Sequence, residues 1–134
     1  IQHMKKSIVL TLLLLIASFS FAQQKAAWKE MQEFHVVMGK TFHPSEENNL
    51  QPLRNHSAEL VEKAKAWQTA AVPDGYNGEA VKPVLKKLVK KTVAINKAVK
   101  KQRSDAELKK MITEAHDIFH EITEKCRPGE EEKH

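Results

Sequence analysis

The fold is decided by the stretch DAELKKMITEAHDIFHEITEKC, residues 105–126. Its inner positions recur every three or four residues, at Leu108, Ile112, Ala115, Phe119, Ile122 and Cys126. An α-helix turns once every 3.6 residues, so this spacing places these side chains on one stripe of a helix. The stretch therefore predicts an amphipathic helix that buries one face and leaves its charged residues on the other.

Three further stretches of the sequence show the same period. We expect helices over residues 24–42, 52–71, 79–101 and 105–126. In the first of them, the predicted inner stripe is Trp28, Met31, His35, Met38 and Phe42. No stretch shows the alternating pattern of a half-buried strand. The sequence thus predicts an all-α fold, an antiparallel up-down-up-down four-helix bundle.

The connection between the first two helices is predicted to be long, from Thr41 to Gln51. It is rich in side chains that carry chemistry, among them His43 and Glu47. A plain bundle turn needs only a few residues, so a loop of this length either covers a site or is a simple polar connector.

The start of the chain predicts export. Met4, Lys5 and Lys6 form a short basic start, and an apolar run over residues 8–21 follows them and ends at Ala22. This order is typical of a secretory signal peptide, here with cleavage after Ala22. The apolar run is short for a membrane span, although a retained anchor is the alternative. We therefore expect a periplasmic or secreted protein.

The remaining chain predicts one small domain. Residues 1–22 comprise the signal peptide, with residues 1–3 a cloning remnant; residues 23–127 form the bundle, and residues 128–134 form a frayed acidic tail. The formal net charge of +5 is modest, and an exported protein is not expected to bind nucleic acid. Cys126 is the only cysteine, so no internal disulfide forms. We expect it to be buried as a small apolar residue; a second metal site or a homodimer crosslink are the alternatives.

Histidines on two helices predict a metal site. His116 and His120 are four residues apart, on one helical face and one turn from each other. Neutral imidazole is the commonest metal ligand in proteins. If the first and last helices are antiparallel neighbours, His35 lies at a height similar to that of His116. These three side chains form a plausible ligand set, whereas the plain alternative for His35 is a core histidine bonded to a carbonyl or carboxylate.

The ligand set can be completed from the long loop. His43 or Glu47 would reach the site if the loop folds back along the first helix, and a second cluster of His43, Glu47 and His56 is also conceivable. Nitrogen and carboxylate ligands suit a divalent transition metal, with zinc or copper expected first and nickel next. Sulfur from Met31 and Met38 would favour copper(I), although both are expected first as core residues.

The third predicted helix is strongly basic. No acidic residue interrupts the stretch from Lys82 to Arg103, which carries Lys82, Lys86, Lys87, Lys90, Lys91, Lys97, Lys100, Lys101 and Arg103. The plain interpretation is a solvated outer face. The alternative is a weak contact of this face with an anionic membrane or an acidic protein.

Three features of the sequence are shared with a known group of proteins: four helical seams over residues 24–126, Met31 early in the first helix, and His120 near the end of the last. On these features the chain resembles the cytochrome c-prime and soluble b-type cytochrome superfamily. The resemblance implies haem bound by Met31 and His120. The Cys-x-x-Cys-His motif that attaches haem in c-prime members is missing from the sequence, so the resemblance also implies a relative that holds metal without a porphyrin.

The sequence lacks the motifs of common metal-dependent and phosphate-binding enzymes. It has no His-Glu-x-x-His, no pair of inward Glu-x-x-His motifs on two helices and no glycine-rich phosphate loop. We therefore predict a metal-binding bundle rather than an enzyme. A non-covalent haem electron carrier and a metal-free envelope adaptor or stress protein are the alternatives.

Overall fold

The computed structural model describes residues 28–126, without the side chain of Lys125. The predicted signal peptide and acidic tail lie outside these residues. Four helices occupy the described part of the chain: α2 (Lys29–Glu46), α3 (Gln51–Thr69), α4 (Gly78–Lys100) and α5 (Asp105–Lys125). No strand occurs in this part, so the prediction of an all-α fold with four helices is confirmed. Within residues 28–126, no helix has the length and apolar character needed to span a membrane.

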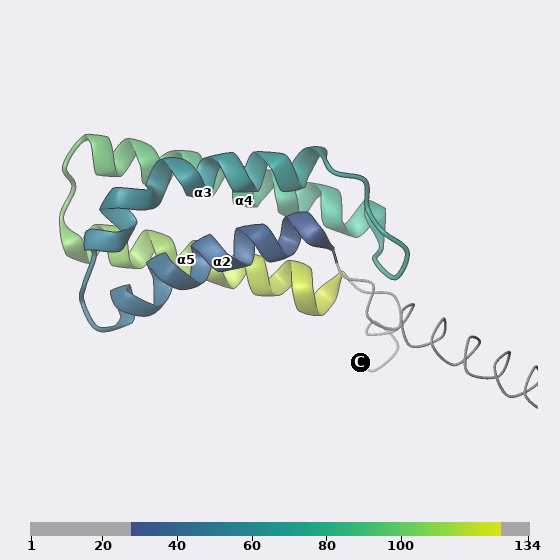
Figure 1. Cartoon of the computed structure of the whole chain (residues 1–134), viewed down its shortest axis with the longest axis horizontal. Coiled ribbons are helices and arrows are strands. Elements are labelled where there is room, and N and C mark those ends of the chain that lie inside the picture. Colours follow the sequence, from purple (N-terminus) through teal and green to yellow (C-terminus); the bar gives the residue numbers. More distant parts are fainter. Residues whose placement is uncertain (1–27, 127–134) are drawn as a thin grey trace, which may run out of the picture.

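The four helices enclose one core. Each helix packs against the next along the chain, and α5 returns to the side of α2 (Figure 1). The colours in Figure 1 show that successive helices run in opposite directions. The α2–α5 interface is less extensive than the α2–α3 interface. His35 of α2 and His116 of α5 each stack on an aromatic ring across this α2–α5 interface.

The core confirms the predicted stripe of α5 and corrects that of α2. All six predicted positions of α5, from Leu108 to Cys126, are buried. On α2 the buried side chains are Phe34, Val37, Met38, Thr41, Phe42 and Ser45. The prediction that His35 belongs to the inner stripe is wrong, because this residue is exposed. Phe34 takes the place expected for His35, since burying a phenyl ring is favourable whereas burying an imidazole requires hydrogen-bond partners.

The end of α2 also differs from the prediction. The sequence predicted that this helix ends at Phe42, just before Pro44. The helix instead continues through Pro44 to Glu46. The Pro44 carbonyl accepts hydrogen bonds from the backbone N–H of Glu47 at 3.1 Å and of Asn49 at 2.9 Å, which close the end of the helix. The connection to α3 is therefore only residues 47–50, and the predicted long loop is wrong.

The start of α5 rests on a side-chain cap. Ser104 precedes the helix, and its Oγ accepts a hydrogen bond from the backbone N–H of Glu107 at 3.2 Å. This bond satisfies an N–H group that has no partner within the helix.

Replacing Ser104 with alanine is expected to lower the free energy of unfolding by about 1 kcal/mol, because the Glu107 N–H loses its acceptor. Ser104→Asp keeps an acceptor at the same position and is expected to stay close to the wild type. Urea denaturation followed by far-UV circular dichroism measures both. An alanine variant as stable as the aspartate variant would show that the cap contributes nothing.

Candidate metal centre

The two histidines of α5 meet at their outer ring nitrogens. The Nε2 atoms of His116 and His120 are 3.2 Å apart, and the rings stand at 76° to each other. Two nitrogens that bind one tetrahedral ion at 2.0–2.1 Å are separated by about 3.3 Å. The pair therefore already has the separation that two ligands of one zinc or copper ion require.

Glu124 orients one of these rings. Its Oε1 lies 3.3 Å from Nδ1 of His120, one helical turn away along α5. With the proton on Nδ1 donated to this carboxylate, the Nε2 of His120 carries its lone pair toward His116. A carboxylate behind a ligating histidine fixes the ring and strengthens it as a ligand. In the absence of a metal, the Nε2–H of His116 can donate to that lone pair; binding of a metal to this Nε2 would require the proton to move to Nδ1 of His116.

His116 is held from the other side by α2. Its ring stacks on the ring of Phe42, with centroids 3.8 Å apart and planes at 6°. Partial burial lowers the pKa of His116, and repulsion between the two rings when both are protonated lowers it further. His116 is therefore kept neutral, which is the form that binds metal.

His35 lies on the exposed side of α2 at a different level. Its ring stacks on Phe119 with centroids 5.1 Å apart, while the residue that faces His116 is Phe42. His35 and Phe42 are seven positions apart on α2, which is about 10 Å along the axis. His35 therefore lies opposite Phe119 and not opposite His116, as the predicted ligand set required.

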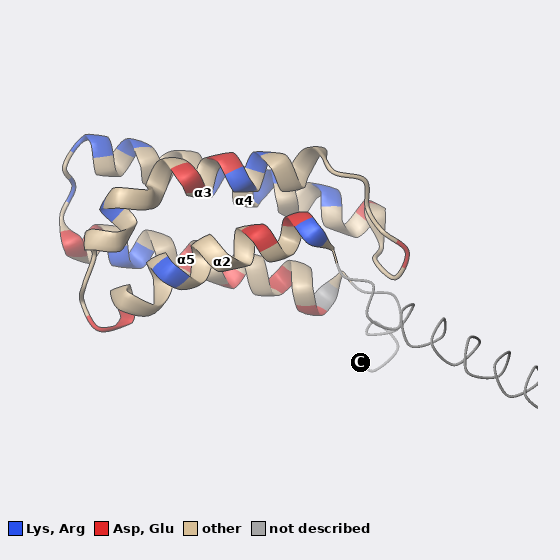
Figure 2. Ribbon diagram, in the orientation of Figure 1, with Lys and Arg blue, Asp and Glu red and all other residues tan. Residues whose placement is uncertain are grey.

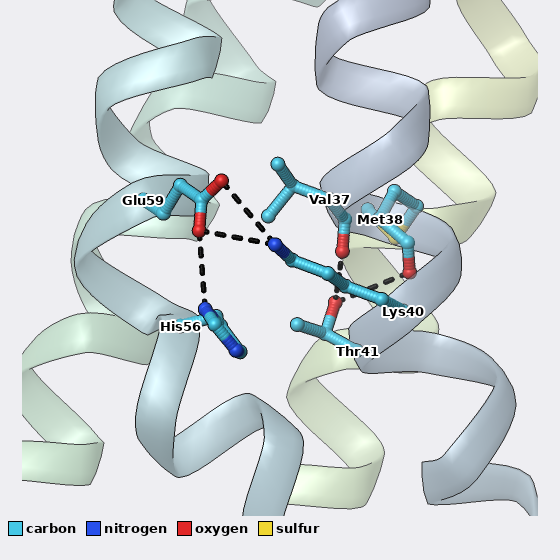
Figure 3. Close-up of polar contacts among 6 residues, drawn as sticks. All are labelled: Val37, Met38, Lys40, Thr41, His56 and Glu59. Carbon is cyan, nitrogen blue, oxygen red and sulfur yellow. Dashed lines mark hydrogen bonds and ion pairs between the residues drawn. The ribbon is translucent and has the colours of Figure 1, made fainter.

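The remaining predicted ligands do not join the pair in a group of three metal ligands among the described residues. Nδ1 of His43 lies 3.3 Å from Glu46 Oε1, and Glu47 is exposed at the end of α2. His56 is on the α2–α3 flank, where its Nδ1 lies 3.1 Å from Glu59 Oε2 (Figure 3). The described residues contain no group of three or more His, Cys, Asp or Glu side chains placed to hold a metal ion. Of the five predicted ligands, the structure brings His116 and His120 into contact.

Figure 3 shows the polar contacts around His56 and Glu59. Glu59 lies between His56 of α3 and Lys40 of α2, and its Oε2 is 3.3 Å from the Lys40 ammonium nitrogen. Hydrogen bonds from Lys40 and then His56 lower the pKa of Glu59. The three side chains form a polar link between α2 and α3. His56 belongs to α3, which shares no extensive interface with α5, the helix that carries the pair.

Acidic side chains surround the histidine pair. A shallow groove of about 490 Å³ along α5 is lined by Lys87, His116, Asp117, Ile118, His120, Glu121 and Glu124. Lys87 of α4 pairs with Glu121 at 3.6 Å. Carboxylates beside the pair give this groove a negative charge that favours a cation. Glu124 was not among the predicted site residues, although its spacing of four residues from His120 places it on the same face of the helix.

His116 makes the stability of the metal-free protein depend on pH. Its pKa in the folded state lies below the ordinary value of 6.5, so the unfolded chain binds more protons below that pH. The free energy of unfolding is therefore highest above about pH 6.5 and falls as the pH drops from there through the lowered pKa. Urea denaturation between about pH 5 and pH 8 measures this slope, and His116→Gln is expected to flatten it. Equal slopes in the two proteins would contradict the assignment.

The site thus offers two imidazole nitrogens at the separation of two metal ligands. Glu124 orients the His120 ring, the lowered pKa of His116 favours its neutral form, and carboxylates lie nearby. Two protein ligands leave the other coordination positions of an ion to water or to a second molecule. Comparison of the chain with protein-family models, with curated proteins and with solved structures gave no match.

Proposed function

We propose that this protein is an exported metal-binding four-helix bundle with up-down-up-down topology. It binds a divalent transition metal through Nε2 of His116 and Nε2 of His120. The observation that carries the proposal is the 3.2 Å separation of these two atoms, which fits two corners of a tetrahedral ion. Export to the periplasm or medium rests on the signal-peptide pattern of residues 1–22. The site binds and holds metal, and the proposal includes no catalysed reaction.

The chemistry of the donors favours zinc or copper(II), with nickel next. Imidazole nitrogen suits all three ions. Copper(I) would require sulfur ligands, but Met38 is buried in the core and the Sδ of Met31 accepts a hydrogen bond from the Tyr76 hydroxyl at 3.6 Å. The donors at the site are therefore nitrogen atoms with carboxylates nearby.

The packed interior favours a small metal ion on the surface of α5 over a haem between the helices. The rings of Phe34, Trp67 and Phe119 contact one another in the core, with centroids 5.6 to 5.9 Å apart. A porphyrin between the helices would have to displace them. The proposed haem ligand His120 is exposed on α5 rather than directed into this core. Met31 and His120 therefore fit a haem site poorly, and the exposed histidine pair fits a small ion.

Metal content of the protein, prepared without a histidine tag, tests the proposal. The protein is dialysed against each of zinc, copper(II) and nickel at equal concentration, and the bound element is measured. We expect about one ion per chain, held by two protein ligands. A protein that retains no metal under these conditions would favour the metal-free adaptor, and a Soret band after addition of hemin would favour the haem carrier.

A further inference from the structure

The outward face of α4 carries a continuous row of lysines. They are all exposed, and their spacing places them on one side of the helix, opposite the buried Val81, Leu85 and Leu88. We call this row the lysine stripe; it consists of Lys82, Lys86, Lys90, Lys97, Lys100 and Lys101. From Lys82 to Lys101 it extends about 28 Å along the helix axis.

The charge of the lysine stripe is not neutralised by the rest of the bundle. The neighbouring lysines that face α5 are paired: Lys87 lies 3.6 Å from Glu121, and Lys91 lies 3.0 Å from Glu114. Among residues 28–126, no ion pair involves a lysine of the stripe. The one acidic side chain of α4 is Glu79, in its first turn. Figure 2 shows the basic residues along α4 and its connection to α5, while acidic residues gather on the other helices.

The composition of the stripe indicates what it can bind. It contains lysine alone, which acts as a point charge and does not form the planar paired bonds of arginine. No aromatic side chain interrupts it, so it offers no stacking surface for nucleic-acid bases. Its face also lacks an apolar anchor: the large hydrophobic residue that the described chain exposes is Val36, on α2. A straight row of point charges without pockets fits an extended, flat anionic surface.

We propose that the lysine stripe adsorbs the bundle onto an anionic phospholipid membrane, with α4 lying parallel to the surface. The attraction is electrostatic and does not require insertion into the bilayer. Each lysine near an anionic surface is expected to strengthen binding about fivefold. Attraction of this kind falls off within the screening length of the salt solution, so it weakens strongly as the ionic strength rises.

Cosedimentation with lipid vesicles tests this proposal on the full chain. We expect binding to vesicles that contain about 30% phosphatidylglycerol, and no binding to pure phosphatidylcholine. Raising the salt concentration from about 0.05 M to about 0.5 M is expected to release the protein. Changing Lys82, Lys86, Lys90 and Lys97 to glutamine is expected to weaken binding several hundredfold, whereas arginine at the same positions retains it.

A matched control separates the stripe from overall charge. Glutamine at Lys29, Lys40, Lys65 and Lys110 removes the same charge from other helices and is expected to weaken vesicle binding far less. Equal losses in the two sets, or no binding of the wild type to anionic vesicles, would overturn the proposal. Preferential binding of soluble heparin over vesicles would also overturn it, in favour of an anionic polymer. His116→Ala/His120→Ala is expected to leave vesicle binding unchanged, so failure of the metal site and failure of the stripe are distinguishable.

Discussion

Replacement of both His116 and His120 by alanine is expected to abolish stoichiometric metal binding. The two Nε2 atoms are the nitrogen donors that the structure brings to ligand separation, at 3.2 Å. Removal of an outer partner of a metal ligand already weakens binding about 10- to 100-fold, so the loss of both ligands is expected to exceed that range. Isothermal titration calorimetry with zinc and copper(II) measures the effect.

Three single variants locate the site more closely. His116→Ala and His120→Ala are each expected to weaken binding at least 100-fold, because one remaining imidazole cannot hold the ion in place. Glu124→Gln keeps both ligands but removes the carboxylate behind His120, and a loss of about tenfold is expected. Far-UV circular dichroism of each variant establishes that the helices remain formed.

Histidines outside the pair provide the control. His35→Ala and His56→Ala are expected to leave metal affinity unchanged, because His35 stacks on Phe119 and His56 belongs to α3, which shares no extensive interface with α5. A loss with His35→Ala as large as that with His120→Ala would instead support a ligand set that joins α2 and α5. Unchanged binding in the double variant would contradict the proposed metal centre.

The sequence predicted the fold class because apolar residues recur every three or four positions along each of the four helices. On α5 the apolar residues at helical spacing, among them Leu108, Ile112 and Phe119, define one inner stripe, and the whole stripe is buried. On α2 two stripes fit the same period, one through Met31, His35 and Met38 and the other through Phe34, Met38 and Phe42. The second is buried because Phe34 contacts Trp67 of α3 and Phe119 of α5. Such partners on other helices cannot be read from the spacing within α2.

For the candidate site, too, the sequence predicted the arrangement within one helix but not the contacts between helices. The i, i+4 spacing placed His116 and His120 on one face, and the structure brings their nitrogens together. The prediction of His35, His43 and Glu47 as further ligands depended on a long loop and on equal heights of two helices. Pro44 was expected to end α2, yet it is accommodated in the last turn, so the loop is short. The relative height of two helices depends on how their side chains pack, here Phe42 on His116.

The corrected register of α2 predicts very different effects at adjacent residues. Phe34 is fully buried and contacts Trp67 and Phe119, with ring centroids 5.6 and 5.8 Å apart. Phe34→Ala removes a ring from the centre of the core and leaves a cavity, so the free energy of unfolding is expected to fall by about 3–5 kcal/mol. That is a large part of the total stability of a small domain. Urea denaturation followed by far-UV circular dichroism measures the loss.

The two residues that follow Phe34 are the matched controls. Val36 is 68% exposed, and Val36→Ala is expected to change the free energy of unfolding by no more than about 0.5 kcal/mol. His35 is exposed but stacks on Phe119, so His35→Ala is expected to cost about 1 kcal/mol or less. If His35→Ala destabilised the protein as much as Phe34→Ala, the inner stripe of α2 would be the one through Met31 and His35. A large loss confined to Phe34 would place the helix in the register described here, with His35 outside the core and the metal site on α5 alone.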